Sequence, residues 1–261
     1  MLLQPFIGAL LVYTWLDWRR LNWTLIPALA AVVLVFLVRE PLIVVARQRW
    51  VWRTPHAETE QARRFLAWEL PLLAAAGGAL AFVWSFRILA ILGGAAAALT
   101  ALAVFMTIRN RQRAIWFQAL SAAGLGSSAL AVCFAIDGSI PTWGWWFWGL
   151  HAAHFLAAIL VVHARLEARI AARRNTAFSI PRDTMALQIV WLAAGIGLVA
   201  MNLPLYGAAA ILSGAAHVLS LRTLNTPEAV AMPMKTVGLR AMALSIVFTL
   251  LIVAGSIWRA R

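Results

Sequence analysis

Residues 65–113 read FLAWELPLLAAAGGALAFVWSFRILAILGGAAAALTALAVFMTIRNRQR. The two apolar runs in this stretch, 65–84 and 87–107, each have about the 20 residues that an α-helix needs to cross a bilayer. The break between them holds one basic residue, Arg87, whereas the break after the second holds three, Arg109, Arg111 and Arg113. The stretch therefore predicts two transmembrane helices with a weakly basic connection between them and a strongly basic one after them.

The remainder of the chain repeats this pattern. It is 63% hydrophobic and 12% charged, whereas soluble domains are about 45–50% apolar and about 25% charged. The sequence therefore predicts one all-α transmembrane domain over residues 1–261, a polytopic helical bundle of about nine helices. The expected helices lie near residues 1–16, 21–38, 65–84, 87–107, 114–136, 141–164, 184–202, 204–221 and 239–258.

The first of these runs is short. A helix over residues 1–16 would reach only about 24 Å, against a hydrocarbon core of about 30 Å. A signal peptide is the alternative interpretation, but the run has no basic segment before it and no small-x-small cleavage site after it. We therefore interpret it as the first helix.

The basic residues alternate from one side to the other of this nine-helix arrangement. Seventeen of the 22 fall into every second connection, while Arg19, Arg20, Arg87, Arg259 and Arg261 fall into the others. Because cytoplasmic connections are enriched in Lys and Arg, the N-terminus is predicted inside and the C-terminus outside a cell inner (plasma) membrane. The seventeen are Arg39, Arg47, Arg49, Arg53, Arg63, Arg64, Arg109, Arg111, Arg113, Arg165, Arg169, Arg173, Arg174, Arg182, Arg222, Lys235 and Arg240.

The net charge of +13 would suggest nucleic acid as the partner of a soluble protein. Here the arginines gather at the ends of apolar runs, where they serve as topology signals and anchors to lipid headgroups. Membrane lipid is therefore the predicted partner, and no nucleic acid is expected.

Common catalytic signatures are absent from the sequence. It contains no phosphate-binding G-x-x-x-x-G-K-[ST], no H-E-x-x-H, no G-x-S-x-G and no acidic pair spaced for a divalent metal. The single Cys133 excludes an intramolecular disulfide and a thiolate metal cluster. No metal site is predicted, and the hydrolase and ATPase classes have no support.

Three histidines lie inside the apolar runs. His151 and His154 are three residues apart and share a helix face, and His217 follows Pro204 by thirteen residues, as His154 follows Pro141. The two spans run in the same direction, so His154 and His217 should lie at similar depth. The three could hold haem, bind a proton or substrate, or simply form hydrogen bonds between helices.

A second group of candidates lies at the predicted inner helix ends. Arg39-Glu40-Pro41 is expected to end the second helix, Glu69 to lie five residues into the third, and Arg165 to end the sixth. Separated charges of this kind could line a ligand cavity, since Arg binds carboxylates and phosphates through two parallel hydrogen bonds. The alternative is ordinary snorkelling to the interface and salt bridges within loops.

Four motifs carry a family resemblance: Met1-Leu2-Leu3-Gln4-Pro5-Phe6, Val38-Arg39-Glu40-Pro41-Leu42, Leu150-His151-Ala152-Ala153 and His163-Ala164-Arg165-Leu166. The chain resembles the YwiC-like family of bacterial membrane proteins over almost its whole length. The biochemical function of that family is not established. Its members usually carry a segment similar to Lys/Arg-Glu-His-Gly-Ala before the position of Met1, so the resemblance implies a start assigned too late or a truncated first helix.

The predicted topology also resembles that of UbiA-type prenyltransferases, which have nine helices and active-site loops after the second and sixth. Those enzymes hold magnesium and a prenyl diphosphate with aspartate clusters. The matching stretches here offer only Arg39-Glu40 and Arg165-x-Glu167. The resemblance therefore implies a shared bundle without magnesium-dependent prenyl transfer.

These observations lead to one functional hypothesis with two alternatives. We expect a cavity open to the cytoplasm and bordered by the second, third, sixth and eighth helices, which binds or acts on a lipid-like ligand. The alternatives are a transporter for a small or amphipathic solute and a haem-linked redox protein. The expected ligand-binding residues are Arg39, Glu40, Glu69, His151, His154, Arg165 and His217.

Overall fold

The computed structural model describes residues 2–54, 56–111 and 114–260, and over these residues the chain is helical and contains no strand. A bilayer interior offers no water to its backbone N–H and C=O groups, and a helix satisfies almost all of them within one segment. The predicted all-α fold is therefore confirmed.

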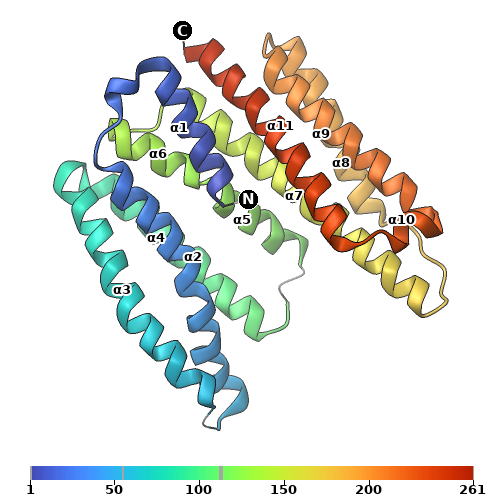
Figure 1. Ribbon diagram of the computed structural model, residues 1–261, viewed down its shortest axis with the longest axis horizontal. Helices are drawn as coiled ribbons and strands as arrows, with labels where there is room; N and C mark the ends of the chain where they lie inside the picture. The colour runs from blue at the N-terminus through green and yellow to red at the C-terminus, as the bar shows by residue number, and fades with distance from the viewer. Residues whose placement is uncertain (1, 55, 112–113, 261) are drawn as a thin grey trace.

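Most of the described residues lie in eleven α-helices (Figure 1). They are α1 (Leu3–Asp17), α2 (Leu25–Arg47), α3 (Ala57–Val83), α4 (Phe86–Ile108), α5 (Ile115–Gly126), α6 (Ser128–Asp137), α7 (Thr142–Arg173), α8 (Arg182–Ala200), α9 (Pro204–Arg222), α10 (Pro227–Ala231) and α11 (Met234–Ala260). Short 3₁₀ turns follow α1 and α9, and the π-helical turn Gln48–Trp52 extends α2.

Within the part of the chain that the structure describes, eight helical stretches are long and apolar enough to cross a membrane. They are α2 with its π turn, α3, α4, α5 together with α6, α7, α8, α9 and α11. The first helix, α1, has 15 residues and spans only about 22 Å. Its start lies against α6, where the hydroxyl of Ser128 donates to the carbonyl of Leu2 at 2.8 Å.

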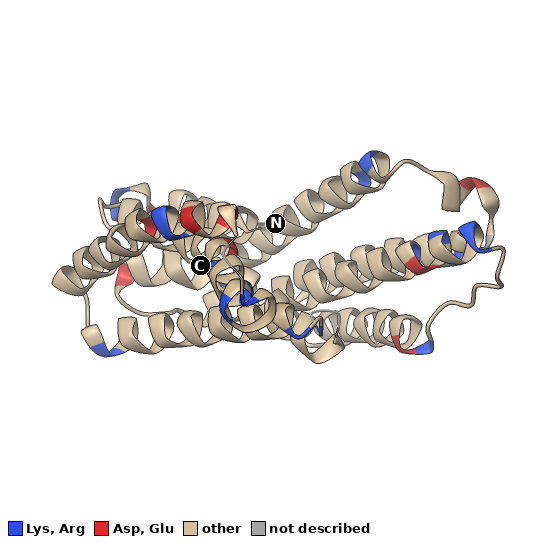
Figure 2. Ribbon diagram, turned by 90° about the horizontal axis from the view of Figure 1, so that it is seen from below, with Lys and Arg blue, Asp and Glu red and all other residues tan. Residues whose placement is uncertain are grey.

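The helices form two groups (Figure 1). One consists of α2, α3 and α4, and the other of α7, α8, α9 and α11, with α1, α5 and α6 between them. Charged residues gather towards the helix ends, and long uncharged stretches lie between them (Figure 2). We call the end of the bundle that holds the α2–α3, α7–α8 and α9–α11 connections the basic end. Its assignment to the cytoplasm stays a prediction.

Three predicted helix boundaries are wrong. The second helix does not end at Arg39-Glu40-Pro41, because α2 continues through Pro41 to Arg47. The third begins at Ala57, so Glu69 lies in its interior, and the sixth continues past residue 164 to Arg173. The added residues of α3 and α7 are largely Arg, Glu, Gln and Ala, which favour helix whether or not lipid surrounds them, whereas α2 continues through the apolar residues 41–46. Hydropathy indicates which residues lie in the hydrocarbon. It does not indicate where the hydrogen-bonded helix begins or ends.

The helix predicted over residues 114–136 is interrupted. It divides into α5 and α6 at Ser127, whose hydroxyl donates to the carbonyl of Gly124 at 2.7 Å. At Gly126 a side chain would lie 3.2 Å from the carbonyl oxygen of Trp148. The interruption therefore lies next to a close contact between α5 and α7.

Apolar side chains pack the interior and also cover the outside. The largest buried cluster includes Phe147, Tyr206, Phe248 and Ile252, from α7, α9 and α11. Outside, Phe82 is 90% exposed. In water so much apolar surface would be unfavourable, whereas lipid chains can cover it without cost.

Glycines bring α8 and α9 into direct backbone contact. A Cβ atom at Gly207 would lie 2.6 Å from the carbonyl oxygen of Gly195 and 2.9 Å from the nitrogen of Val199. Both atoms belong to the backbone and cannot move aside cheaply. Close approach of this kind is how membrane helices associate when lipid removes the hydrophobic driving force.

Replacing Gly207 by Ala should therefore destabilise the bundle by about 1–3 kcal/mol, since the methyl group forces the two backbones apart. The matched control is Gly197→Ala on α8, where a Cβ atom meets nothing within 4 Å. Thermal unfolding in detergent should show a lower midpoint for Gly207→Ala and an unchanged or slightly higher one for Gly197→Ala. Equal midpoints would contradict the close packing.

Candidate functional site

Three neighbouring helices direct polar side chains into the space between them. We call the nine residues concerned the polar column; eight are buried and Ser220 is half-buried. Their spacing along each helix places them on one face. They are His151, His154 and Arg165 on α7, Ser213, His217 and Ser220 on α9, and Ser245, Thr249 and Ser256 on α11.

His151 is held in one orientation by two hydrogen bonds. Its Nδ1 lies 2.9 Å from the carbonyl oxygen of Phe147, which can only accept, so this nitrogen carries the proton. Its Nε2 then accepts from the hydroxyl of Thr249 at 3.0 Å. The same hydroxyl oxygen accepts from the side-chain amide of Gln4 at 2.7 Å. A chain of hydrogen bonds therefore connects α1, α11 and α7.

His154 lies one turn further along α7. Its Nε2 is 2.9 Å from the hydroxyl oxygen of Ser245, whereas its Nδ1 is buried and has no hydrogen-bond partner. The ring stacks on Phe248 with centroids 4.1 Å apart. A buried ring nitrogen without a partner costs about 1–3 kcal/mol, so His154 is the least satisfied member of the column.

His217, on α9, contacts His154 on α7 and Gln188 on α8. Its ring lies 5.7 Å from that of His154, centroid to centroid and nearly parallel. Its Nδ1 donates to the amide oxygen of Gln188 at 3.2 Å, and the amide nitrogen of Gln188 donates to the carbonyl of Ala157 at 3.0 Å. The two histidines thus lie at a common depth, as the thirteen-residue spacing predicts.

The histidine pair does not fit haem. An axial pair must direct one ring nitrogen each at the iron, from opposite faces of the porphyrin. His154 and His217 instead stack on each other with centroids 5.7 Å apart, which leaves no space for a porphyrin between them. Among the described residues, no group of three or more His, Cys, Asp or Glu side chains is placed to hold a metal ion. Metal and haem chemistry therefore gain no support from these side chains.

The basic end of α7 holds two arginines that bind backbone carbonyls. Arg165 is buried and donates through Nη1 to the carbonyl of Ala229 at 2.7 Å and through Nη2 towards the hydroxyl of Ser220 at 3.4 Å. Arg169 donates to the carbonyl of Val230 at 3.0 Å and also to that of Met232. These bonds fix α10 against α7.

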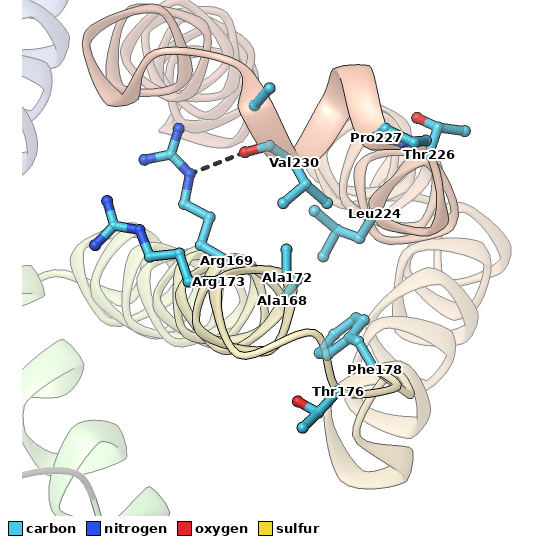
Figure 3. A pocket seen from close by; sticks show the side chains of 11 residues that line it. Ala168, Arg169, Ala172, Arg173, Thr176, Phe178, Leu224, Thr226, Pro227 and Val230 are labelled. Atoms are coloured by element: carbon cyan, nitrogen blue, oxygen red, sulfur yellow. Dashed lines mark hydrogen bonds between the residues drawn. The ribbon is translucent and has the colours of Figure 1, made fainter.

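A pocket of about 650 Å³ lies beside these arginines, and we call it the basic-end pocket (Figure 3). Arg169 and Arg173 extend to one side of α7, away from Phe178 (Figure 3). The pocket is therefore lined by charged side chains on one side and by apolar side chains on the other. The apolar wall is formed by Ala168, Ala172, Phe178, Leu224 and Val230.

The expected residues on the second and third helices lie elsewhere. Arg39 and Glu40 are on α2 and Glu69 is on α3, which packs against α2 and α4 at the edge of the bundle opposite α8 and α9 (Figure 1). Arg39 Nε and Glu69 Oε2 are both buried without a hydrogen-bond partner. A single cavity bordered by the second, third, sixth and eighth helices is therefore not what the structure shows. A ligand-binding role for these three residues stays a prediction.

Sequence reasoning missed several members of the site. Ser245 and Thr249 are four residues apart in an apolar run, and that spacing alone could have indicated a polar face on α11. Gln188 gives a comparable signal, since it is an amide inside a span. Arg169 and Arg173 were interpreted only as topology signals.

The class of protein follows from the fold: a polytopic helical membrane protein with a column of polar side chains in a mainly apolar interior. The family model described as YwiC-like protein matches residues 1–133, about half of the chain. The chain therefore belongs to the YwiC-like family. No curated protein and no solved structure matches it. The matched half contains Arg39, Glu40 and Glu69 and ends before His151, so the polar column lies outside it.

Replacing Thr249 by Val should leave His151 Nε2 and the amide of Gln4 without partners, at a cost of about 1–3 kcal/mol. The control is Thr100→Val on α4, whose hydroxyl donates only to the carbonyl of Ala96 within its own helix. Thermal unfolding in detergent should show the larger loss for Thr249→Val. If both variants unfold at the same temperature, the hydrogen bonds between α1, α7 and α11 contribute nothing to stability.

Proposed function

We propose that this protein binds a lipid-like ligand in the basic-end pocket. The observation that carries the proposal is the composition of its wall, where two arginines stand beside a continuous apolar surface. An amphipathic molecule has a polar head for the first and a hydrocarbon chain for the second. A polar solute would leave the apolar wall unused, and a pure hydrocarbon would leave the arginines unpaired.

The position of the pocket supports the same conclusion. It lies at the end of α7, which is a candidate membrane-spanning helix, and between α7, the α7–α8 connection and α10. A ligand there can keep its chain near the hydrocarbon and its head near water. A volume of about 650 Å³ is within the range of about 300–1,000 Å³ usual for small-molecule sites.

Arg173 and Phe178 test the two walls separately. Replacing Phe178 by Ala should weaken retention of the hydrocarbon chain, and replacing Arg173 by Gln should weaken retention of the head, each by about 3–10-fold, equivalent to about 0.7–1.4 kcal/mol. The measurement is mass spectrometry of lipid retained after purification and after exchange into nanodiscs.

The matched control is Arg174→Gln. Arg174 is the next residue along the chain and is also exposed, but it does not line the pocket. Its retained lipid should equal that of the wild type. Equal losses in Arg173→Gln and Arg174→Gln would show a general effect of positive charge and would contradict a specific site.

A second candidate function is proton-linked transport of the same ligand. The polar column favours it, because His151, His154 and His217 continue from Arg165 into the middle of the bundle. Imidazole is the side chain best suited to exchange protons near neutral pH. Ionisable residues at membrane depth commonly mark substrate or proton pathways.

Proteoliposomes with an entrapped pH dye test this candidate. Adding the lipid identified by mass spectrometry should acidify the interior, and replacing His154 by Asn should abolish the change while the protein stays folded. Thr100→Val is the control and should leave acidification unchanged. Ligand uptake without any pH change would remove proton-linked transport.

A further inference from the structure

Arg165 is a buried cation without an anionic partner. Its side chain is only 4% exposed, and its two hydrogen bonds go to a backbone carbonyl and a hydroxyl, both uncharged. Its Nε is buried and has no partner. The three ion pairs formed among the described residues join Arg20 to Asp17, Arg20 to Asp137, and Arg64 to Glu60, and none involves α7.

Two further positive charges act on Arg165. They are Arg169, one turn away on α7, and Arg240 on α11, and both oppose its own positive charge. We call these three residues the arginine cluster. Glu167, two residues along α7, and Glu228, the neighbour of Ala229 in the chain, are both exposed and form no ion pair within the described residues. Over these residues the cluster therefore concentrates positive charge from two helices without an ion pair to balance it.

Such an arrangement is unfavourable by itself. Burying an ion costs several kcal/mol unless an opposite charge and hydrogen bonds compensate. Neighbouring cations add to the cost, and the carbonyls of Ala229, Val230 and Met232 compensate only in part. The missing component is an anion, and guanidinium groups are well suited to bind phosphate through parallel hydrogen bonds.

We propose that the arginine cluster is the binding site for a phosphate-type anionic group that lies between α7 and the start of α11. This inference rests on the proposed function and deepens it, because Arg169 belongs both to the cluster and to the basic-end pocket. A phosphate held there would place the rest of an amphipathic ligand against Ala168, Leu224 and Val230. The ligand class is then a phospholipid with an exposed, highly charged phosphate, or a free phosphate of the same chemistry.

The test compares three lipids with the same acyl chains: phosphatidic acid, phosphatidylglycerol and diacylglycerol. Saturable binding to the full-length protein in nanodiscs should be tightest for phosphatidic acid, weaker for phosphatidylglycerol and weakest for diacylglycerol. Saturable but equal binding of all three would overturn the anion site and leave the lipid-binding function standing. No saturable binding of any of them would overturn the proposed lipid function itself.

The variant that isolates the cluster is Arg240→Gln. Arg240 is exposed on α11 and forms no hydrogen bond to α10, so its replacement should not unfold the pocket. It should weaken phosphatidic acid binding about 10-fold and leave diacylglycerol binding unchanged. Lys235→Gln, on the first turn of α11, is the control and should change neither. An Arg240→Gln variant that binds phosphatidic acid as the wild type does would overturn the proposal.

Inorganic phosphate separates the two sources of the anion. If the ligand is a phospholipid, millimolar phosphate should displace phosphatidic acid only weakly and diacylglycerol not at all. If phosphate alone binds as tightly as phosphatidic acid, and Arg240→Gln weakens both, the site belongs to a free phosphate. Displacement of phosphatidic acid that is equal in wild type and in Arg240→Gln would show general ionic screening and would count against the site.

Discussion

A bilayer leaves no polar group to be satisfied by water, and this constraint shapes the protein at two levels. For the backbone it permits only helices across the described residues. For the side chains it favours polar groups that find a partner inside the bundle. Thr249 shows the result most clearly, since one hydroxyl serves both Gln4 on α1 and His151 on α7. The contacts of these three helices are thus fixed by hydrogen bonding as well as by packing.

The longest helix, α7, takes part both in the apolar packing and in the hydrogen bonding between helices. Its first half contributes Phe147 to the apolar cluster and His151 and His154 to the polar column, and its second half contributes Arg165 and Arg169 to the basic end. A single rigid element therefore connects the middle of the membrane with the pocket at its edge. Any rearrangement at the pocket that moves α7 or α11 must also change the environment of His154, which lies against both.

Hydropathy was sufficient to predict the helices but not their ends. The apolar runs identified every spanning segment, because about 20 apolar residues in sequence leave few other structures. The continuation of α2 through Pro41 and of α7 to Arg173 could not be read from hydropathy, since helix propensity and local hydrogen bonding set those limits. The interruption at Ser127 lies within an apolar run, so hydropathy does not mark it.

The candidate site was predictable only within single helices. The shared depth of His154 and His217 follows from counting residues from Pro141 and Pro204, whereas their contact depends on how α7 and α9 pack. Helix packing also separates Glu69 from the histidines, because α3 packs on α2 and α4 instead of on α7. Residue spacing determines depth along the membrane normal, and it carries no information about which helices are neighbours.

The arginines illustrate the difference between a topology signal and a site. Positive charge near a cytoplasmic surface needs only to stay near that surface, and exposed residues such as Arg173 and Arg174 meet that requirement. Arg165 does more than topology requires, since it is almost completely buried and carries one nitrogen without a partner. Part of that burial is explained by its bond to Ala229, which fixes α10. A neutral donor could fix α10 equally well, so the charge itself is what calls for an anion.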